Sequence, residues 1–264
     1  MKKILPVFAA LLLASGVFAA AAAPKADPVK AGDACFNLRN SITDTAADLI
    51  NMDKAIAYYK EAFDADKTDG KLLLKYAKAL DFKYRYLTGT AEEKKAKYED
   101  LSREFEQYGA SMGKTKEYNF VMALMYARRG DLTPNVLEAA KEGVADKIKN
   151  YAEAVYNIDR AFEDYASCLI LGRLHYKSPN IVFVLTWPDK NKSKDYLEEI
   201  YRALPGDTEA KYFLADTYWE LGKRDEATKL YKEAAASKPR ADHWYYDNLA
   251  IEHVKARMEE LGIK

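Results

Sequence analysis

The sequence predicts an all-α protein built from antiparallel helical hairpins that form a helical array or a compact bundle. Beyond residue 30, apolar residues recur at intervals of three and four along nearly the whole chain, which is the spacing of one buried helix face. Glycine and proline lie mostly in the gaps between these segments, where helices end. Of the 264 residues, 49% are hydrophobic, so the chain can bury a substantial core.

The first residues predict a leader rather than a structural element. Lys2 and Lys3 precede an apolar run over residues 4–18, and the small residues 19–23 fit a cleavage site. We therefore expect residues 1–23 to be a secretory signal peptide. The run is shorter than the roughly 18 consecutive apolar residues that a spanning helix needs. The mature chain is expected to be a soluble periplasmic or otherwise exported protein without a membrane span.

Local start signals place several helices. Thr90 and Glu93 have the spacing of a capping box, in which hydroxyl and carboxylate satisfy the first amides of a helix. Thr133 followed by Pro134 predicts another helix start, because proline lacks only an amide that would be unpaired there. The predicted helices span 33–50, 53–65, 69–88, 91–108, 115–129, 134–157, 161–177, 191–203, 208–221, 224–237 and 243–261. Most connections are short, as between antiparallel neighbours.

A unit of 34 residues separates Pro205 from Pro239. Its small residues let two helices approach closely, while leucine and aromatic side chains fill the space between neighbouring pairs. These positions are Leu214, Ala215, Tyr218, Leu221, Gly222, Ala227, Tyr231 and Ala234. Together they resemble the tetratricopeptide repeat (TPR), a helix–turn–helix unit of 34 residues. The resemblance implies hairpins of TPR type, with degenerate repeats over 24–158 and clearer ones over 159–264.

An insertion interrupts the earlier of the two C-terminal units. Gly172 and Ala215 occupy equivalent positions but lie 43 residues apart, so about nine extra residues fall within 178–192. Most of this stretch is apolar and it is bracketed by prolines, so it cannot continue either helix. Two roles stay open: an extended segment buried over the helices, or a ligand-channel wall or partner-docking loop that uses Phe183 and Trp187.

The C-terminal part also resembles a particular family. "LGRLHYKSP", the irregular apolar loop after it, and "YYDNLAIEHVKARMEELG" near the end make residues 165–264 similar to periplasmic TPR-like proteins grouped with the T component of TRAP transporters. The resemblance implies a non-catalytic binding or adaptor protein with an aromatic-lined groove or channel for a small organic ligand. It also implies a solute-binding transporter subunit as the protein partner. The alternative is a TPR scaffold that binds only proteins, in envelope assembly or secretion.

Arginine and aromatic side chains on the first helices of the C-terminal hairpins are the candidate binding residues, because first helices line the inner surface of such arrays. Arg128 and Arg129, by contrast, are predicted to be helix-end charges that complement the helix dipole. The candidate ligand- or partner-binding set, with the two insertion residues, is Arg173, Tyr176, Phe183, Trp187, Tyr212, Trp219 and Trp244.

Other chemistries find no support in the residue pattern. The 41 basic and 41 acidic side chains interleave along the chain, which argues against a nucleic-acid partner. His175, His243 and His253 lack metal-ligand spacing, and no nucleophile or phosphate-loop motif is present. We expect no enzyme activity, cofactor or metal. Cys35 and Cys168 are either one disulfide, which an exported protein permits, or two buried thiols.

Overall fold

The computed structural model describes residues 27–40, 45–133, 142–181 and 185–264, and these confirm the all-α helical repeat array. No helix in these ranges is long and apolar enough to cross a membrane. The elements are α1 (Pro28–Asn37), η1 (Leu38–Asn40), α2 (Thr45–Ala65), α3 (Gly70–Phe82), the π-helical turn η2 (Lys83–Leu87), α4 (Ala91–Glu106), α5 (Gly109–Met112), α6 (Lys116–Asp131), α8 (Val144–Ile158), α9 (Phe162–Lys177), α10 (Lys190–Ala203), α11 (Thr208–Glu220), α12 (Arg224–Ala235), η3 (Ala241–His243) and α13 (Trp244–Glu260). The predicted leader, residues 1–23, lies outside the described residues.

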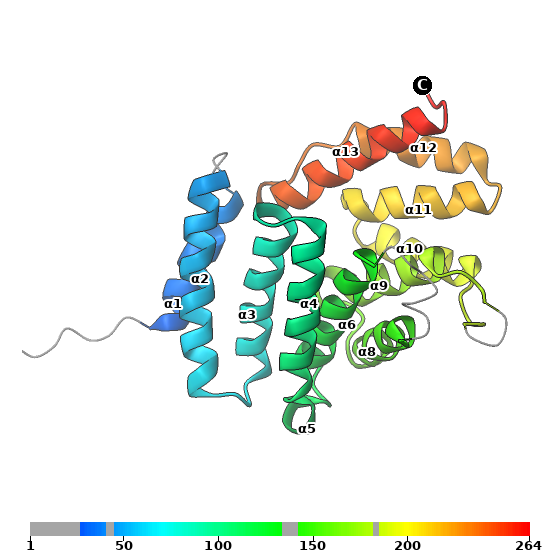
Figure 1. Ribbon diagram of the computed structural model, residues 1–264. Coiled ribbons are helices and arrows are strands. Elements are labelled where there is room, and N and C mark those ends of the chain that lie inside the picture. The colour runs from blue at the N-terminus through cyan, green and yellow to red at the C-terminus, as the bar shows by residue number, and fades with distance from the viewer. Residues whose placement is uncertain (1–26, 41–44, 134–141, 182–184) are drawn as a thin grey trace, which may run out of the picture.

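The helices form two layers. Helices α3, α6, α9, α11 and α13 each pack against the next in this series, and we call them the first-helix layer (Figure 1). The second layer is staggered against the first. Helix α8 contacts α6 and α9, α10 contacts α9 and α11, and α12 contacts α11 and α13. This stagger buries a continuous core along a stack of hairpins.

The small residues of the predicted repeat are packing residues. Ala215, Ala227 and Ala234 are completely buried between the paired helices. At Gly172, an added Cβ would lie only 2.6 Å from Leu197 Cγ, closer than real side chains approach. Glycine is therefore required where α9 crosses α10, and the equivalent position on α11 accepts alanine.

Two predicted helix boundaries near the N-terminus are wrong. The helix predicted over 33–50 is instead α1, which begins at Pro28 behind the N-cap Asp27 and ends at Asn37. The predicted break near residue 52 is absent, because α2 runs unbroken from Thr45 to Ala65. Met52 lies inside this helix and is fully buried. Core packing there outweighs the weak local signal for a helix end.

The helix predicted over 134–157 is interrupted at Gly143, and its predicted start at Pro134 lies outside the described residues. Residues 134–141 lie outside the described residues, and α8 starts only at Val144. Gly143, the residue before it, has φ 66°, a left-handed angle that interrupts a right-handed helix. The Thr133 hydroxyl donates to the Arg129 carbonyl at 2.8 Å, so in the described structure it bonds back to the end of α6.

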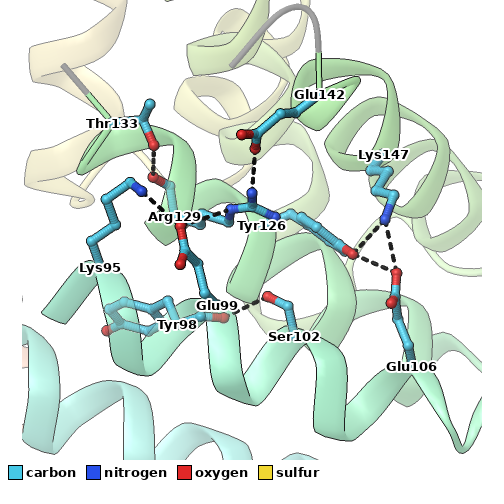
Figure 2. A network of polar contacts seen from close by, with 10 residues as sticks. All are labelled: Lys95, Tyr98, Glu99, Ser102, Glu106, Tyr126, Arg129, Thr133, Glu142 and Lys147. Carbon is cyan, nitrogen blue, oxygen red and sulfur yellow. Dashed lines mark hydrogen bonds and ion pairs between the residues drawn. The ribbon is translucent and has the colours of Figure 1, made fainter. Parts of the chain in front are cut away.

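A polar network ties α4, α6 and α8 together (Figure 2). Lys147 Nζ donates to Glu106 Oε1 at 2.9 Å and to the Tyr126 hydroxyl at 2.7 Å. The Tyr126 hydroxyl also donates to Glu106, which closes a triangle between three helices. Arg129 adds ion pairs to Glu142 and to Glu99 on α4. These contacts hold α6 and α8 against α4.

The link from α8 to α9 contains an unusual backbone. Glu163, Asp164 and Tyr165 have φ values of 49°, 56° and 62°, three consecutive non-glycine residues in left-handed conformation. Each such residue costs about 1–2 kcal/mol, and only single residues normally adopt it. Regular right-handed geometry in α9 therefore begins only after Tyr165.

The buried side chains form two main clusters, and the first extends past this link to Leu174 of α9. The first gathers residues of α2, α3, α4, α6 and α8, and the second gathers residues of α9 to α13. A smaller cluster of Ala123, Ala152 and Leu171 joins α6, α8 and α9. The division at residues 158/159 into two structural units stays a prediction.

The two cysteines are free thiols, so the optional disulfide is not formed. Cys35 packs against the first cluster and Cys168 is buried in the second. Burial raises the pKa of the Cys168 thiol to about 12, which keeps it protonated and unreactive. The two side chains act as small hydrophobic groups in separate cores.

Candidate binding surface

A series of ion pairs joins each helix of the first-helix layer to the next, and we call it the charged ladder. Each rung joins an aspartate of one helix to an arginine or lysine of the following or preceding one. The rungs are Asp81 Oδ1 to Arg128 Nε at 2.9 Å, Asp131 Oδ1 to Lys177 Nζ at 2.7 Å, Asp216 Oδ2 to Arg173 Nη1 at 3.0 Å, and Asp216 Oδ1 to Arg257 Nε at 3.5 Å. The ladder therefore runs from α3 through α6, α9 and α11 to α13.

Among the ladder residues, Asp216 has the most hydrogen-bond and ion-pair partners. Its side chain is only 5% exposed, and besides the two guanidinium groups it accepts a 2.7 Å hydrogen bond from the Tyr231 hydroxyl. Burial, with the neighbouring Asp216 charge, raises the pKa of Tyr231, so the phenol keeps its proton and donates. A buried carboxylate with this many donors holds α9, α11, α12 and α13 in one arrangement.

Asp81 plays the corresponding part in the N-terminal half. It accepts from Arg128 of α6 and, at 2.8 Å, from the Tyr98 hydroxyl of α4. Burial raises the pKa of Tyr98, and the adjacent Asp81 carboxylate acts in the same direction. Arg128 does lie in the last turn of α6, but its guanidinium pairs with a side chain of another helix. The predicted helix-end position is confirmed for both Arg128 and Arg129, and the ion pair with Asp81 is an additional role of Arg128.

Three of the predicted site residues lie together at the ladder, and one of them, Arg173, is itself part of a rung. The Arg173 guanidinium lies 4.8 Å from the ring centroid of Tyr176 and 4.0 Å from that of Phe213. Tyr212 follows on α11 and interacts electrostatically with Arg173 and Asp216. Burial raises the pKa of Tyr176 to about 12 and also raises that of Tyr212. Arg173, Tyr176 and Tyr212 are half-buried.

Two further predicted residues contact other side chains, and Trp219 shares its neighbour Tyr231 with Tyr212. The Trp219 ring packs against the Arg224 guanidinium at 3.9 Å and faces Tyr231 of α12. Trp244 opens α13, where its ring meets Tyr245 edge to face at 5.0 Å. Trp244 has 37% of its surface exposed.

The insertion folds back on itself and covers helices. Ile181 and Leu185 exchange two backbone hydrogen bonds of 2.8 Å, and Leu185 is buried. Trp187 donates its indole N–H to Asp146 of α8 at 2.8 Å. Residues 182–184, Phe183 among them, lie outside the described residues. Leu185 and Trp187 therefore contact the array itself, and a role of Phe183 or Trp187 in binding stays a prediction.

His175 anchors the return of the insertion to α9. Its ring is 1% exposed, lies edge to face with Trp187 at 5.2 Å, and stacks on Tyr196 at 6.0 Å. Its Nδ1 accepts a 3.1 Å hydrogen bond from the Asp189 amide, which requires an unprotonated nitrogen. Burial lowers the pKa of His175 to about 4.

Acid is expected to destabilise the chain through His175. Because its pKa is lower in the folded state than the ordinary 6.5, its contribution is complete above pH 6.5 and is lost as pH falls toward 4. The loss is on the order of 3 kcal/mol. Urea unfolding between pH 7.5 and 4 measures it, and His175→Gln is expected to flatten this part of the profile. The matched control is His253→Gln, an exposed histidine of α13; an equal flattening in both variants would refute the assignment.

The charged ladder was missed at the sequence level, although it leaves a weak signal. Asp81 lies in "ALDF" and Asp216 in "LADT", each a single acid among buried residues of a helix. An acid at such a position needs a partner, because an unpaired buried charge is costly. The partner itself cannot be read from spacing, since Arg128 lies 47 residues beyond Asp81.

Other parts of the surface offer less. A pocket of about 430 Å³ lies between the ends of α12 and α13, and one of about 240 Å³ lies beside Arg129; the predicted site residues line neither. Over the described ranges, no group of three or more His, Cys, Asp or Glu side chains is arranged to hold a metal ion. The arrangement beside the ladder suits non-covalent binding by stacking and hydrogen bonding.

The comparisons with known proteins agree with this architecture. Residues 191–246 match the family model of the tetratricopeptide repeat. TTC0263, a thermophilic TPR protein of Thermus thermophilus, is similar in structure with a TM-score of 0.53 and 15% sequence identity, over 84% of this chain and 99% of that one. The chain has a TPR-like fold. Yeast Tom70 also matches, at 14% identity over 88% of this chain and 64% of that chain, but its TM-score of 0.31 supports no argument. No curated protein matches this TPR-like chain.

Proposed function

We propose that this TPR-like chain is a non-catalytic scaffold that binds a protein partner along its first-helix layer. The observation that carries the proposal is the group of Arg173, Tyr176 and Tyr212 beside the charged ladder. Arginine and tyrosine are the residue types enriched where binding energy concentrates in protein interfaces. The ladder supports them, because its ion pairs hold the helices that present these side chains in a fixed arrangement.

The finer role implied by the family resemblance belongs to the same proposal. An exported adaptor of a TRAP-type uptake system would take a solute-binding subunit as its partner and a small organic ligand in a channel. That role rests on the likeness of residues 165–264 to the T-component proteins. The surface beside the ladder, which mixes charged and aromatic groups, favours the protein-binding scaffold.

Peptides selected from a random display library against the purified chain test the proposal. In isothermal titration with a selected peptide, Tyr176→Ala and Tyr212→Ala are each expected to weaken binding about tenfold, which corresponds to loss of an interface hot spot. The matched control is Tyr58→Ala, a tyrosine on α2 with 37% of its surface exposed, which is expected to bind normally. Unchanged affinity in both test variants would rule out this surface as the binding site.

A further inference from the structure

The two ends of the array touch, which an ordinary repeat stack does not do. In a stack of repeats each unit contacts only its neighbours. Here the start of α13 returns to the end of α3, as Figure 1 shows. The Tyr245 ring meets Phe82 edge to face at 5.1 Å, Tyr246 meets Tyr86 at 5.3 Å, and the Tyr245 hydroxyl donates to Asp48 of α2. We call this contact the latch.

Ion pairs between the N-terminal and C-terminal halves of the chain reinforce the latch. Arg85 of the π-helical turn lies 3.2 Å from Glu209 at the start of α11. The Arg85 guanidinium also lies 5.8 Å from the ring centroid of Tyr246. Lys78 of α3 pairs with Glu163 in the link before α9. These side-chain contacts therefore tie the N-terminal half to α11 and α13, in addition to the packing of α9 against α6 and α8.

Some of these contacts hold the segment between α8 and α9 whose backbone is strained. Glu163 pairs with Lys78, and Asp164 Oδ2 lies 3.8 Å from His243 Nε2 in the segment that leads into α13. Lys78 and His243, the two partners of the left-handed segment, thus lie on α3 and just before α13, the two helices that meet at the latch. Left-handed residues persist only where surrounding contacts over-determine them, and such strain gathers at segments that switch conformation.

The closed latch also buries polar atoms at a cost. Within the part of the chain that the structure describes, the Tyr86 hydroxyl and Arg39 Nε are buried without a hydrogen-bond partner. The Arg39 guanidinium lies 5.7 Å from the centroid of the Phe82 ring, so both atoms belong to the latch region. Separation of α13 from α3 would let water reach them. The buried unpaired atoms at the latch and the left-handed residues of the link therefore both raise the free energy of the closed state.

We propose that residues 163–165 are a strained joint about which the array opens, and that the latch holds it shut. In the open state Glu163, Asp164 and Tyr165 take right-handed angles and extend α9 by about one turn. The aromatic rings of Phe82, Tyr86, Tyr245 and Tyr246 become accessible together. No bond is made or broken, and the change is a shift between two populations of the chain alone.

Distance measurement by double electron–electron resonance tests the opening. Spin labels at Lys60 of α2 and Lys229 of α12, both on exposed side chains, report on the two halves after Cys35 and Cys168 are replaced by alanine. Lys78→Ala is expected to add a longer-distance population, and Tyr246→Ala to enlarge it. A distance distribution unchanged by both variants, in chains that still unfold cooperatively, would overturn the proposal.

A matched pair of substitutions tests the joint separately. Asp164→Gly and Asp164→Ala both remove the carboxylate, but only glycine adopts φ near 56° without strain. In the Lys78→Ala background the ratio of open to closed chains is expected to be about fivefold lower for glycine than for alanine. At an unstrained helical position alanine is the more stabilising residue, so equal or reversed ratios would show that the joint stores no strain. Both measurements use the chain without any partner, so their outcome is independent of the proposed binding function.

Discussion

Replacement of Asp216 by alanine is expected to lower the free energy of unfolding by about 3–5 kcal/mol, because it leaves two arginines and a phenol without their shared acceptor. The Asp216 carboxylate lies 3.0 Å from Arg173 and 3.5 Å from Arg257, and it accepts from Tyr231 at 2.7 Å. Removal of one partner from a buried ion pair costs more than the pair contributes, since the remaining charges stay desolvated. Urea unfolding at neutral pH measures the loss.

Asp195→Ala is the control for this substitution. Its side chain lies on α10 with 68% of its surface exposed and pairs with the adjacent Lys194, so a change below about 0.5 kcal/mol is expected. The double variant Arg173→Ala, Asp216→Ala is expected to lose less than the sum of the two single losses, because it removes both members of one rung. Strictly additive losses would mean that the rung is not an energetic unit.

Truncation of Phe82 to alanine is expected to cost about 3–5 kcal/mol. The ring is completely buried at the end of α3 and lies 5.1 Å from both Tyr86 and Tyr245. Its removal opens a cavity and takes away the surface on which the start of α13 packs. Thermal and urea unfolding report the loss.

Tyr58→Ala provides the comparison, since it removes an aromatic ring of similar size from the partly exposed face of α2. It is expected to cost less than about 1 kcal/mol. If Phe82→Ala were as mild as Tyr58→Ala, the contact between the ends of the array would contribute little to stability. The start of α13 and the end of α3 would then lie close together without stabilising each other.

Part of the architecture could be predicted because its causes are local. The spacing of apolar residues places α10, α11 and α12 to within three residues, and the predicted capping box is present, with Thr90 and Glu93 bonded reciprocally. The alanines of the 34-residue unit were correctly interpreted as packing positions. The errors arose where local signals were weak, as at residue 52, where burial carries α2 through a predicted break.

Of the candidate site, Arg173, Tyr176 and Tyr212 could be named because first helices of a repeat share one layer. Their partners could not. Asp216 lies 43 residues beyond Arg173, and the intervening insertion disguises the register between the two helices. Trp219 and Trp244 were grouped with Arg173 by residue type and helix membership, but their direction depends on which neighbours pack around them.

Periodicity and side-chain volume were enough for helices, hairpin pairing and the repeat unit, because each of these depends on residues within about one hairpin of one another. The charged ladder, the latch and the left-handed joint depend instead on the accumulated rotation of successive hairpins, which brings Tyr245 to Phe82 and His243 to Asp164. Small rotations per repeat add along the stack, so no short stretch of sequence specifies where its ends meet. Only the assembled array decides which charges pair and where strain is held.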